Sequence, residues 1–450
     1  MPTRLRLRVA SNPLARGWII WPILLLVLGG CAPSAFHSDP QPTATATLAP
    51  TPTATPRPPS VKEVAVHEAV TGIAVTPDGR VWYGHGSAIS SLSPAGAPGP
   101  SVTLGGPVFN VVLGPDHRPW AVARDSEGWM LARVAPNGTV QSFHVPNGYQ
   151  IDPDQVVAGP DGAMWYLAHG LFLFDAKGHG TASSVIGRIT PAGDSSQYSI
   201  PQANYLGLDF FLRASGAIAA GPDRRIWILL THMSCVSGSA GVNCQDDASR
   251  VAAVSMSGTV QTYAVPGLAI TAGAAIIAGP DGNLWMSTAP NPAIISIAPS
   301  GRMKVYPLPA GSPAAASLAF GPDGALWFTT TDGTAIGRMT IQGATQGTVT
   351  EHPAPKRALH GELPQDVEQP DAIIAGPGGA LWFTERAYAY IGHIAPGETA
   401  VSEVALPDTT YPTSVQGAIV AGADGTLWYS RTLFNASAYP MGGGVGLITP

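Results

Sequence analysis

Three ionisable side chains stand at one position of a phrase that the chain repeats. The phrase contains a tryptophan, and the residue three places after it is His85 in the first copy, Glu385 in the seventh and Arg431 in the eighth. An imidazole can remove a proton, a carboxylate can hold a cation, and a guanidinium can stabilise an oxyanion. Brought together, these groups could bind a polar ligand or assist a reaction beside a carbonyl group.

A charged segment before the seventh copy adds to this set. Residues 356–371 (KRALHGELPQDVEQPD) are rich in ionisable side chains, including His360, although charged residues make up only 12% of the chain. Because the segment leads into the strands that end at Glu385, it predicts a ligand or metal pocket on that rim. The alternative is a solvated loop with a Glu–Arg ion pair, a kind of contact that contributes little at a surface.

The composition limits the fold that can hold these groups. The 450 residues include 53 Gly and 44 Pro, and 45% of the chain is hydrophobic. Gly and Pro cost about 1 and 3 kcal/mol in a helix interior, so long helices are excluded, whereas the apolar content excludes general disorder. The net charge of −6 and the absence of a long basic block exclude a nucleic-acid partner.

The repeated phrase fixes the architecture. A small apolar strand, a Pro-Asp-Gly turn and a Leu-Trp-aromatic strand recur at intervals of about 49 residues, with two further strands in each repeat. This pattern predicts an all-β protein, an eight-bladed β-propeller, with seven blades as the alternative if the second repeat, with Pro119 before its Trp, fails to form. We expect the tryptophans and turn aspartates to be structural. The tryptophans are Trp82, Trp120, Trp165, Trp227, Trp285, Trp327, Trp382 and Trp428.

The two ends of the repeat region predict how the ring closes. The last repeat stops at residues 445–450, which form its third strand, while residues 61–70 precede the first repeat as an unpaired outer strand. Pairing of these segments would remove both exposed sheet edges. The closed ring would place the first, seventh and eighth repeats side by side, so that His85, Glu385 and Arg431 meet in one sector of one rim.

The first sixty residues predict export and anchoring. Residues 1–30 have a basic start and an apolar stretch at 18–28 that is too short to span a membrane, as in a secretory signal peptide. They end in Leu-Gly-Gly before Cys31, which resembles a bacterial lipobox, and residues 31–60 form a Pro/Thr-rich tether. We expect an extracytoplasmic lipoprotein, held to the membrane only through its N-terminal lipid, with the propeller at 61–450 as a monomer. An ordinary signal peptide is the alternative.

The other two cysteines lie close together in the sequence. Cys235 and Cys244 flank a Ser/Gly-rich stretch that we interpret as one long surface loop. In an exported protein we expect a disulfide to close this loop, because no second Cys or His pair stands nearby at metal-ligand spacing.

The repeats resemble one known family. The phrases GPDGALWFT and IGRMT, followed by an outer strand ending in Pro, are similar to those of the virginiamycin B lyase family of β-propellers, over residues 73–450. The resemblance implies magnesium-assisted elimination that opens the ester bond of a cyclic depsipeptide. It implies Glu385, in WFTE, and Glu403, in the following outer strand, as metal ligands. Where a histidine closely follows the metal glutamate in the family, this chain has Arg386 and Ala387.

Two functions remain open from the sequence. In the first, the protein is a carbon–oxygen lyase in which Glu385 and Glu403 hold Mg²⁺, His85 or His360 is the base, and Arg431 stabilises the enolate. In the second, it is a non-catalytic surface propeller that binds a small molecule, peptide, glycan or protein at one rim. A sugar-lactone hydrolase is a minor third hypothesis. The chain has no serine-hydrolase, zincin or nucleotide-binding motif.

Overall fold

The computed structural model describes most of the repeat region. Several sequence predictions lie outside the described residues: the signal peptide (1–30), Cys31 with nearly all of the tether (31–60), and His360 in the segment before the seventh blade. In the described part of the chain, no helix is long and apolar enough to cross a membrane. The described residues are 59–146, 148–170, 173–174, 180–181, 184–200, 209–238, 241–267, 274–289, 291–355, 370–385, 390–407, 413–414, 418–434 and 440–449.

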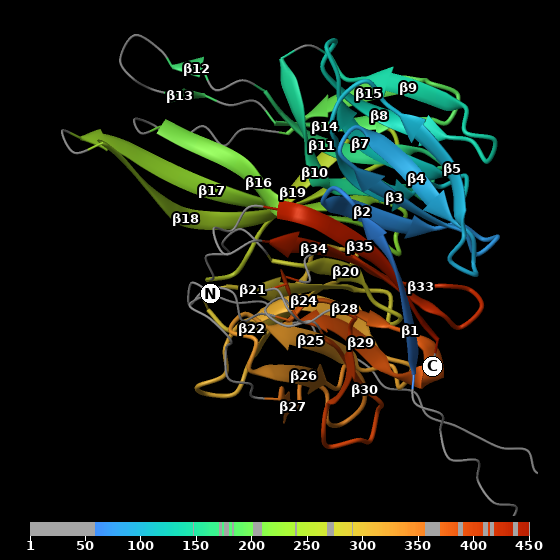
Figure 1. The fold of residues 1–450 in the computed structure, drawn as a ribbon. Coiled ribbons are helices and arrows are strands. Elements are labelled where there is room, and N and C mark those ends of the chain that lie inside the picture. Colours follow the sequence, from blue (N-terminus) through green and yellow to red (C-terminus); the bar gives the residue numbers. More distant parts are fainter. Residues whose placement is uncertain are drawn as a thin grey trace, which may run out of the picture. The chain divides into compact units, whose positions relative to one another are not determined.

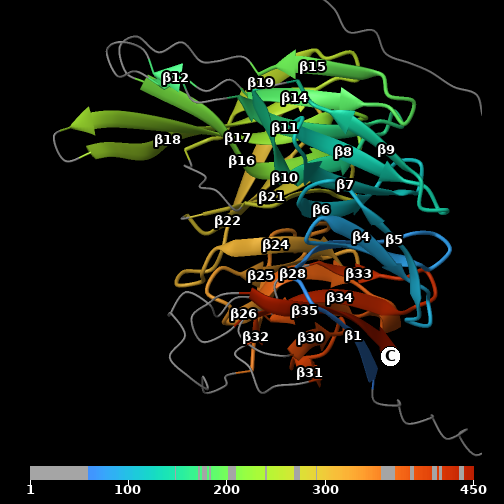
Figure 2. The same ribbon diagram turned by 45° about the horizontal axis from the view of Figure 1, so that its top comes forward.

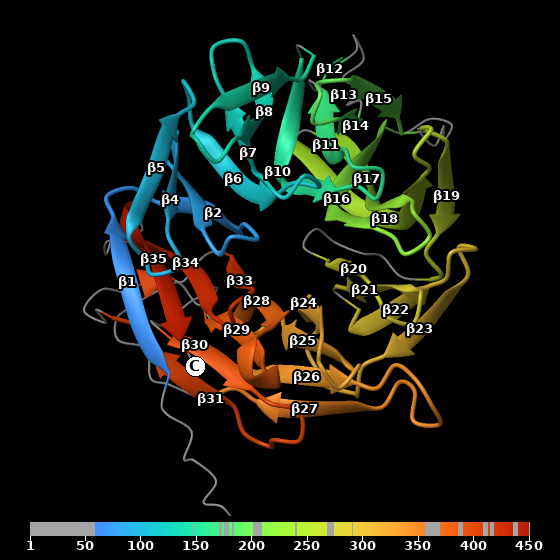
Figure 3. The ribbon, with the colours of Figure 1, turned by 90° about the vertical axis from the view of Figure 1, so that its right-hand side faces the viewer.

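Eight antiparallel sheets form the blades of one ring, viewed along its axis in Figure 3. Blade 1 comprises β2 (Val70–Val75), β3 (Val81–His85), β4 (Ala88–Leu92) and β5 (Pro98–Thr103), and blade 2 comprises β6 (Val108–Leu113), β7 (Pro119–Arg124), β8 (Trp129–Val134) and β9 (Val140–His144). Blade 3 comprises β10 (Tyr149–Ala158), β11 (Met164–Gly170), β14 (Ser184–Ile189) and β15 (Ser195–Ser199), with the short ladder β12 (Leu173–Phe174) and β13 (Gly180–Thr181) between β11 and β14. Blade 4 comprises β16 (Asp209–Ala220), β17 (Ile226–Gly238), β18 (Gly241–Val254) and β19 (Val260–Ala264).

The second half of the chain repeats the same order of strands. Blade 5 comprises β20 (Ile276–Ala278), β21 (Leu284–Thr288), β22 (Ala293–Ile297) and β23 (Met303–Pro307), and blade 6 comprises β24 (Ala315–Phe320), β25 (Leu326–Thr330), β26 (Ala335–Met339) and β27 (Val349–Pro353). Blade 7 comprises β28 (Pro370–Ala375), β29 (Leu381–Glu385), β30 (Tyr390–Ile394) and β31 (Ser402–Ala405), with the 3₁₀ turn η1 (Pro377–Gly379) between its first two strands. Blade 8 comprises β32 (Thr413–Ser414), β33 (Ile419–Ala421), β34 (Leu427–Phe434), β35 (Pro440–Thr449) and β1 (Ser60–Val66).

The N-terminal strand closes the ring as the sequence predicts. In blade 8, β1 pairs antiparallel with β35, from Ser60 opposite Thr449 to Val66 opposite Gly443, and Figure 3 shows the two strands side by side. The second repeat forms a complete blade because Pro119 is the first residue of β7, a position that tolerates proline. The eight-bladed prediction is therefore confirmed and the seven-bladed alternative is wrong.

The core consists of layers between neighbouring blades. Eight buried clusters each contain one phrase tryptophan, which packs against the residue that follows the tryptophan of the next blade. Trp327 of blade 6 meets Phe383 of blade 7, and Trp428 of blade 8 meets Tyr83 of blade 1. The last contact shows that the layering continues across the point of closure.

The turn aspartates orient these tryptophans. In blade 3, the indole Nε1 of Trp165 donates to Asp161 Oδ1 at 3.0 Å, and Arg188 Nε donates to Asp161 Oδ2 at 2.6 Å. The same arrangement joins Trp120 and Arg133 to Asp116 in blade 2, and it recurs in blade 6. The structural role predicted for the turn aspartates is confirmed in these blades.

Because of these aspartates, we expect the free energy of unfolding to decrease in acid. Partial burial alone would raise the pKa of Asp161, but hydrogen bonds from Trp165 and Arg188 hold that pKa below its ordinary value, as similar contacts do for Asp116 and Asp323. A carboxyl group whose folded-state pKa is lowered stabilises the fold above its unfolded value, about 3.9 for Asp, and this stabilisation is lost as pH falls through the folded pKa. Urea denaturation at pH 5.5 and pH 3 should show this decrease. An Asp161→Asn variant should show a smaller decrease, and an equal decrease would contradict the assignment.

The cysteine segment is a hairpin, not the predicted loop. Strands β17 and β18 continue to Gly238 and from Gly241, and they reach beyond the ring on one side (Figures 1 and 2). Cys235 and Cys244 are direct backbone partners in this ladder. Such partners lie about 4.5–5.5 Å apart at Cα, within the range that disulfides span.

A disulfide between these cysteines stays a prediction, and the pairing of Cys235 with Cys244 in the ladder favours it. Intact mass measurement of the exported protein should give a value about 2 Da below the fully reduced mass, restored by a reducing agent. Recovery of both cysteines as free thiols after export would contradict this expectation.

Candidate functional site

The three ionisable residues of the repeat phrase lie in consecutive blades but in different layers. Glu385 ends β29, Arg431 lies in β34 and His85 ends β3, so they belong to blades 7, 8 and 1. Side chains two residues apart in a strand share a face. Each of the three therefore lies on the face that packs against the preceding blade, as the residue after each tryptophan does. The three residues are therefore neighbours around the ring, but Glu385 lies between blades 6 and 7, Arg431 between blades 7 and 8, and His85 between blades 8 and 1.

Arg431 binds the closing strand. Its Nη2 and Nε donate to Glu63 Oε1 at 2.6 and 2.9 Å, and Tyr429 donates its hydroxyl to Glu63 Oε2 at 2.8 Å. Only 3% of the arginine side chain and 9% of the glutamate side chain are exposed. Burial, together with the negative charge of Glu63, raises the pKa of Tyr429. The guanidinium predicted to stabilise an enolate thus joins β34 to β1.

His85 contacts Glu68, which lies two residues after the end of the closing strand. Its Nδ1 lies 3.0 Å from Glu68 Oε2, and its Nε2 lies 2.8 Å from Ser90 Oγ. Ser90 Oγ in turn lies 2.7 Å from Ser101 Oγ. Glu68 belongs to the connection between β1 and β2, so the imidazole, like Arg431, contacts a glutamate of the N-terminal segment.

Blade 7 carries the two predicted metal ligands on one face. Glu403 is the backbone partner of Gly392, which is the partner of Phe383, and Glu385 follows Phe383 by two residues. In blade 8, Arg431 and Glu63 occupy the same two positions and bind each other. At these two positions, blade 7 therefore has two carboxylates, Glu385 and Glu403, whereas blade 8 has an ion pair. Oxygen atoms of both glutamates are buried, and Glu385 is 8% exposed.

This donor set is small for a metal site. Within the described ranges, no group of three or more His, Cys, Asp or Glu side chains is arranged to hold a metal ion. Two carboxylates nevertheless match the chemistry of Mg²⁺, which prefers hard oxygen ligands and keeps several of its waters. Glu385 and Glu403 thus fit magnesium in donor type, and the remaining ligands would be water or substrate.

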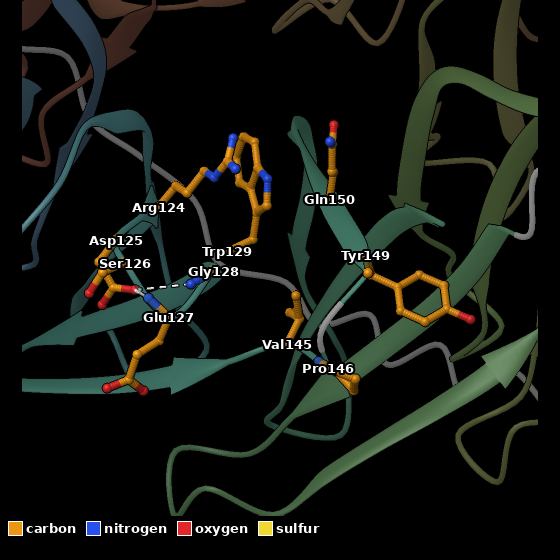
Figure 4. Close-up of a pocket in the computed structure, with 11 residues that line it drawn as sticks. Arg124, Asp125, Ser126, Glu127, Gly128, Trp129, Val145, Pro146, Tyr149 and Gln150 are labelled. Carbon is orange, nitrogen blue, oxygen red and sulfur yellow. Dashed lines mark hydrogen bonds between the residues drawn. The ribbon is translucent and has the colours of Figure 1, made fainter. Parts of the chain in front are cut away.

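A pocket lies on the rim where the second strands end, at blades 2 and 3. It has a volume of about 320 Å³, in the size range of small-molecule sites. Its walls come from the end of β7, the β7–β8 turn, the start of β8 and the connection from β9 into β10 (Figure 4). Arg124, Asp125, Glu127, Trp129, Tyr149 and Gln150 are among the lining residues.

Repeat position did not indicate this pocket, although one signal is present in the sequence. Of the eleven tryptophans, eight belong to the repeat phrase and two, Trp18 and Trp21, to the N-terminal apolar stretch. Trp129 is the remaining one, and it begins a third strand, where no other repeat has a tryptophan. A large aromatic residue at the start of a strand, next to the charged Arg124–Glu127 turn, is an arrangement typical of a ligand site.

The pocket joins a cation, two acids and an aromatic ring. Asp125 accepts the backbone N–H groups of Glu127 at 2.8 Å and Gly128 at 3.2 Å, and it lies 2.9 Å from His144 Nε2. Partial burial alone would raise the pKa of Asp125, but the contacts with His144 and the turn N–H groups lower it. Asp125 therefore stabilises the turn and stays ionised.

The comparisons with known proteins agree with this architecture. The model of the virginiamycin B lyase family matches residues 179–363, less than half of the chain and short of blade 7. A streptogramin B lyase structure is 22% identical, covers 87% of this chain and 98% of its own, and has a TM-score of 0.50. No match was found among curated proteins.

Two further structures are similar. One is a catalytically inactive histidine-to-alanine virginiamycin B lyase from Staphylococcus aureus with quinupristin (21% identity, 87% and 99% coverage, TM-score 0.51). The other is the dihydro-heme d1 dehydrogenase NirN in complex with DHE (14% identity, 84% and 74% coverage, TM-score 0.51). At these identities the likeness concerns the fold alone.

Proposed function

We propose that this virginiamycin B lyase-like propeller is an exported, lipid-anchored protein that binds a small molecule or the end of a peptide on one rim. The observation that carries the proposal is the pocket at blades 2 and 3, where Arg124, Trp129 and Gln150 line a cavity of about 320 Å³. Charged and aromatic side chains around a concave site are typical of ligand pockets. The predicted lipobox at Cys31 and the tether would hold this rim outside the cytoplasmic membrane.

Binding without catalysis is favoured by the contacts of two residues assigned to chemistry. Arg431 is paired with Glu63, and His85 lies between Glu68 and Ser90. Both ring nitrogens of His85 and the guanidinium of Arg431 are engaged within the protein, so this arrangement presents neither group to a substrate, and the contacts join the N-terminal segment to blades 1 and 8. After Glu385 the chain has Arg386 and Ala387, and a similar lyase is inactive when one histidine is replaced by alanine.

A metal-assisted carbon–oxygen lyase is the second candidate function, and the Glu385–Glu403 arrangement favours it. These two carboxylates would hold Mg²⁺, which when bound stabilises the negative charge of an enolate. The residue that removes the α proton would then be His360, from the segment before blade 7, because both ring nitrogens of His85 are engaged, one by Glu68 and one by Ser90.

One pair of measurements separates the two functions. Full-length protein in detergent would be incubated with a streptogramin B antibiotic and Mg²⁺, and ring opening followed by mass spectrometry, with Glu385→Gln as the matched variant. Binding without catalysis predicts intact antibiotic with both proteins. Ring opening that requires Mg²⁺ and is lost in Glu385→Gln would establish the lyase instead.

The binding function has its own test. A thermal-shift screen of small acids, sugars and short peptides should find ligands that raise the melting temperature of the wild-type protein, because a ligand that binds only the folded state stabilises it. The shift should disappear in a Trp129→Ala variant. A screen in which no compound depends on Trp129 would argue against a ligand at this rim.

A further inference from the structure

We propose that the pocket at blades 2 and 3 is selective for an organic carboxylate, which is held by the Arg124 guanidinium and the indole N–H of Trp129. This inference rests on the proposed ligand-binding function and adds the chemical class of the ligand. It concerns side chains of blades 2 and 3, separate from the blade 7 carboxylates.

The Trp129 indole supplies a donor that the protein does not use. Its Nε1 is buried from solvent and has no hydrogen-bond partner in the described structure. A buried donor without an acceptor is costly, and a ligand oxygen would remove that cost once the ring turns to present its N–H to the pocket. The tryptophans of the repeat phrase differ, since those of blades 2 to 6 donate to their turn aspartates.

Arg124 supplies the charge. It is exposed at the end of β7, and no ion pair to it is present in the part of the chain that the structure describes. Both Arg124 and Trp129 line the pocket, and in Figure 4 their side chains extend on the same side of the turn that joins β7 to β8. A guanidinium presents parallel N–H groups that match the two oxygens of a carboxylate.

The two acids of the pocket leave this charge available. Asp125 is engaged by the N–H groups of its own turn and by His144. The Glu127 side chain is 78% exposed, and in Figure 4 it extends away from Arg124. The lining as a whole has one cation and two acids, but neither carboxylate is paired with the guanidinium, so the donors of Arg124 stay available on its side of the pocket.

The remaining walls suit the body of the ligand. Val145 and Pro146 offer apolar surface, Phe109 supports the Trp129 ring at a centroid distance of 4.7 Å, and the Gln150 amide can donate and accept. The volume of about 320 Å³ admits a molecule of monosaccharide or single-residue size. The geometry therefore selects a small acid with a partly apolar body.

Calorimetric titration with two matched probes tests the proposal. N-acetyl-L-phenylalanine carries a carboxylate, and its amide has the same body without the charge. The wild-type protein should bind the acid at least tenfold more tightly than the amide, because charge-assisted hydrogen bonds to the acid are lost in the amide. Arg124→Gln removes the cation, and Trp129→Phe removes the N–H but keeps an aromatic ring on Phe109. Each variant should weaken binding of the acid about tenfold.

The control variant is Arg302→Gln, which removes an equal charge from an exposed turn in blade 5, and it should bind the acid like the wild type. Thermal melts confirm that each variant is folded. Equal binding of acid and amide, no binding of the acid, or binding unaffected by Arg124→Gln would overturn the carboxylate proposal. A neutral ligand whose binding is lost in Trp129→Phe would overturn it while leaving the ligand-binding function intact.

Discussion

Replacing Arg431 with methionine is expected to lower the free energy of unfolding by about 3–5 kcal/mol. The change leaves Glu63, whose side chain is 9% exposed, without the guanidinium that lies 2.6 Å away. A buried carboxylate that loses this cation must either stay charged in a poor environment or take up a proton. Urea denaturation of the wild-type and variant proteins at pH 7 measures the difference.

The matched control is the double variant Arg431→Met with Glu63→Gln. It removes the uncompensated charge while the hydroxyl of Tyr429 keeps an acceptor at 63, so most of the lost stability should return. A single Arg431→Met variant within about 1 kcal/mol of the wild type would show that the ion pair does not secure the closure, contrary to this account.

Replacing Trp327 with alanine is expected to cost about 3–5 kcal/mol. Trp327 is fully buried between blades 6 and 7, where it packs with Phe383 and Ile336, and its Nε1 donates to Asp323 at 3.1 Å. The alanine variant opens a cavity in a layer that other blades cannot fill, and it leaves Asp323 without one donor. Denaturation followed by circular dichroism measures the loss.

Trp327→Phe separates the two contributions to that loss. Phenylalanine keeps most of the aromatic volume but cannot donate to Asp323, so its cost should fall well below that of alanine. A phenylalanine variant as unstable as the alanine variant would indicate that the hydrogen bond, and not the filling of the inter-blade layer, dominates.

The ring could be predicted from the sequence because each blade has a similar short sequence pattern. A tryptophan and a small inner strand recur in all eight repeats, with an aspartate four residues before the tryptophan in every repeat but the seventh, and in the structure the tryptophans recur in buried layers between the blades. The closing strand could be predicted for a different reason. A last repeat without its outer strand and an unpaired strand at the start leave one pairing that removes both edges.

The site could be predicted only in part. Position within the repeat correctly indicates that Glu385, Arg431 and His85 lie in consecutive blades, but not where their side chains end. Arg431 contacts Glu63, a glutamate 368 residues away in the sequence, and His85 contacts Glu68. Side chains alternate between the two faces of a strand, and the face that carries Arg431 and His85 is the one next to the N-terminal segment. Glu403 is the counterpart of Glu63 in blade 7, but the residue facing it there is Glu385 and not an arginine, so the repeat did not indicate an ion pair.

The rim pocket could not be predicted from repeat position at all. It is formed by residues in which blade 2 departs from the repeat, the Asp125–Gly128 turn and Trp129, and by the connection to blade 3. A repeat pattern describes what blades share, whereas a binding site on a propeller depends on what one blade does differently.

The position of β1 has a mechanical consequence. This strand of seven residues begins at Ser60, the last residue of the predicted tether, and it is also the outer strand of blade 8. In a protein held at Cys31, any tension along the tether would act first on the ladder between β1 and β35. The Glu63–Arg431 contact lies at the fourth residue of β1 and would resist peeling of this ladder, so in a tethered protein the strand that closes the ring would also be the strand that bears the load.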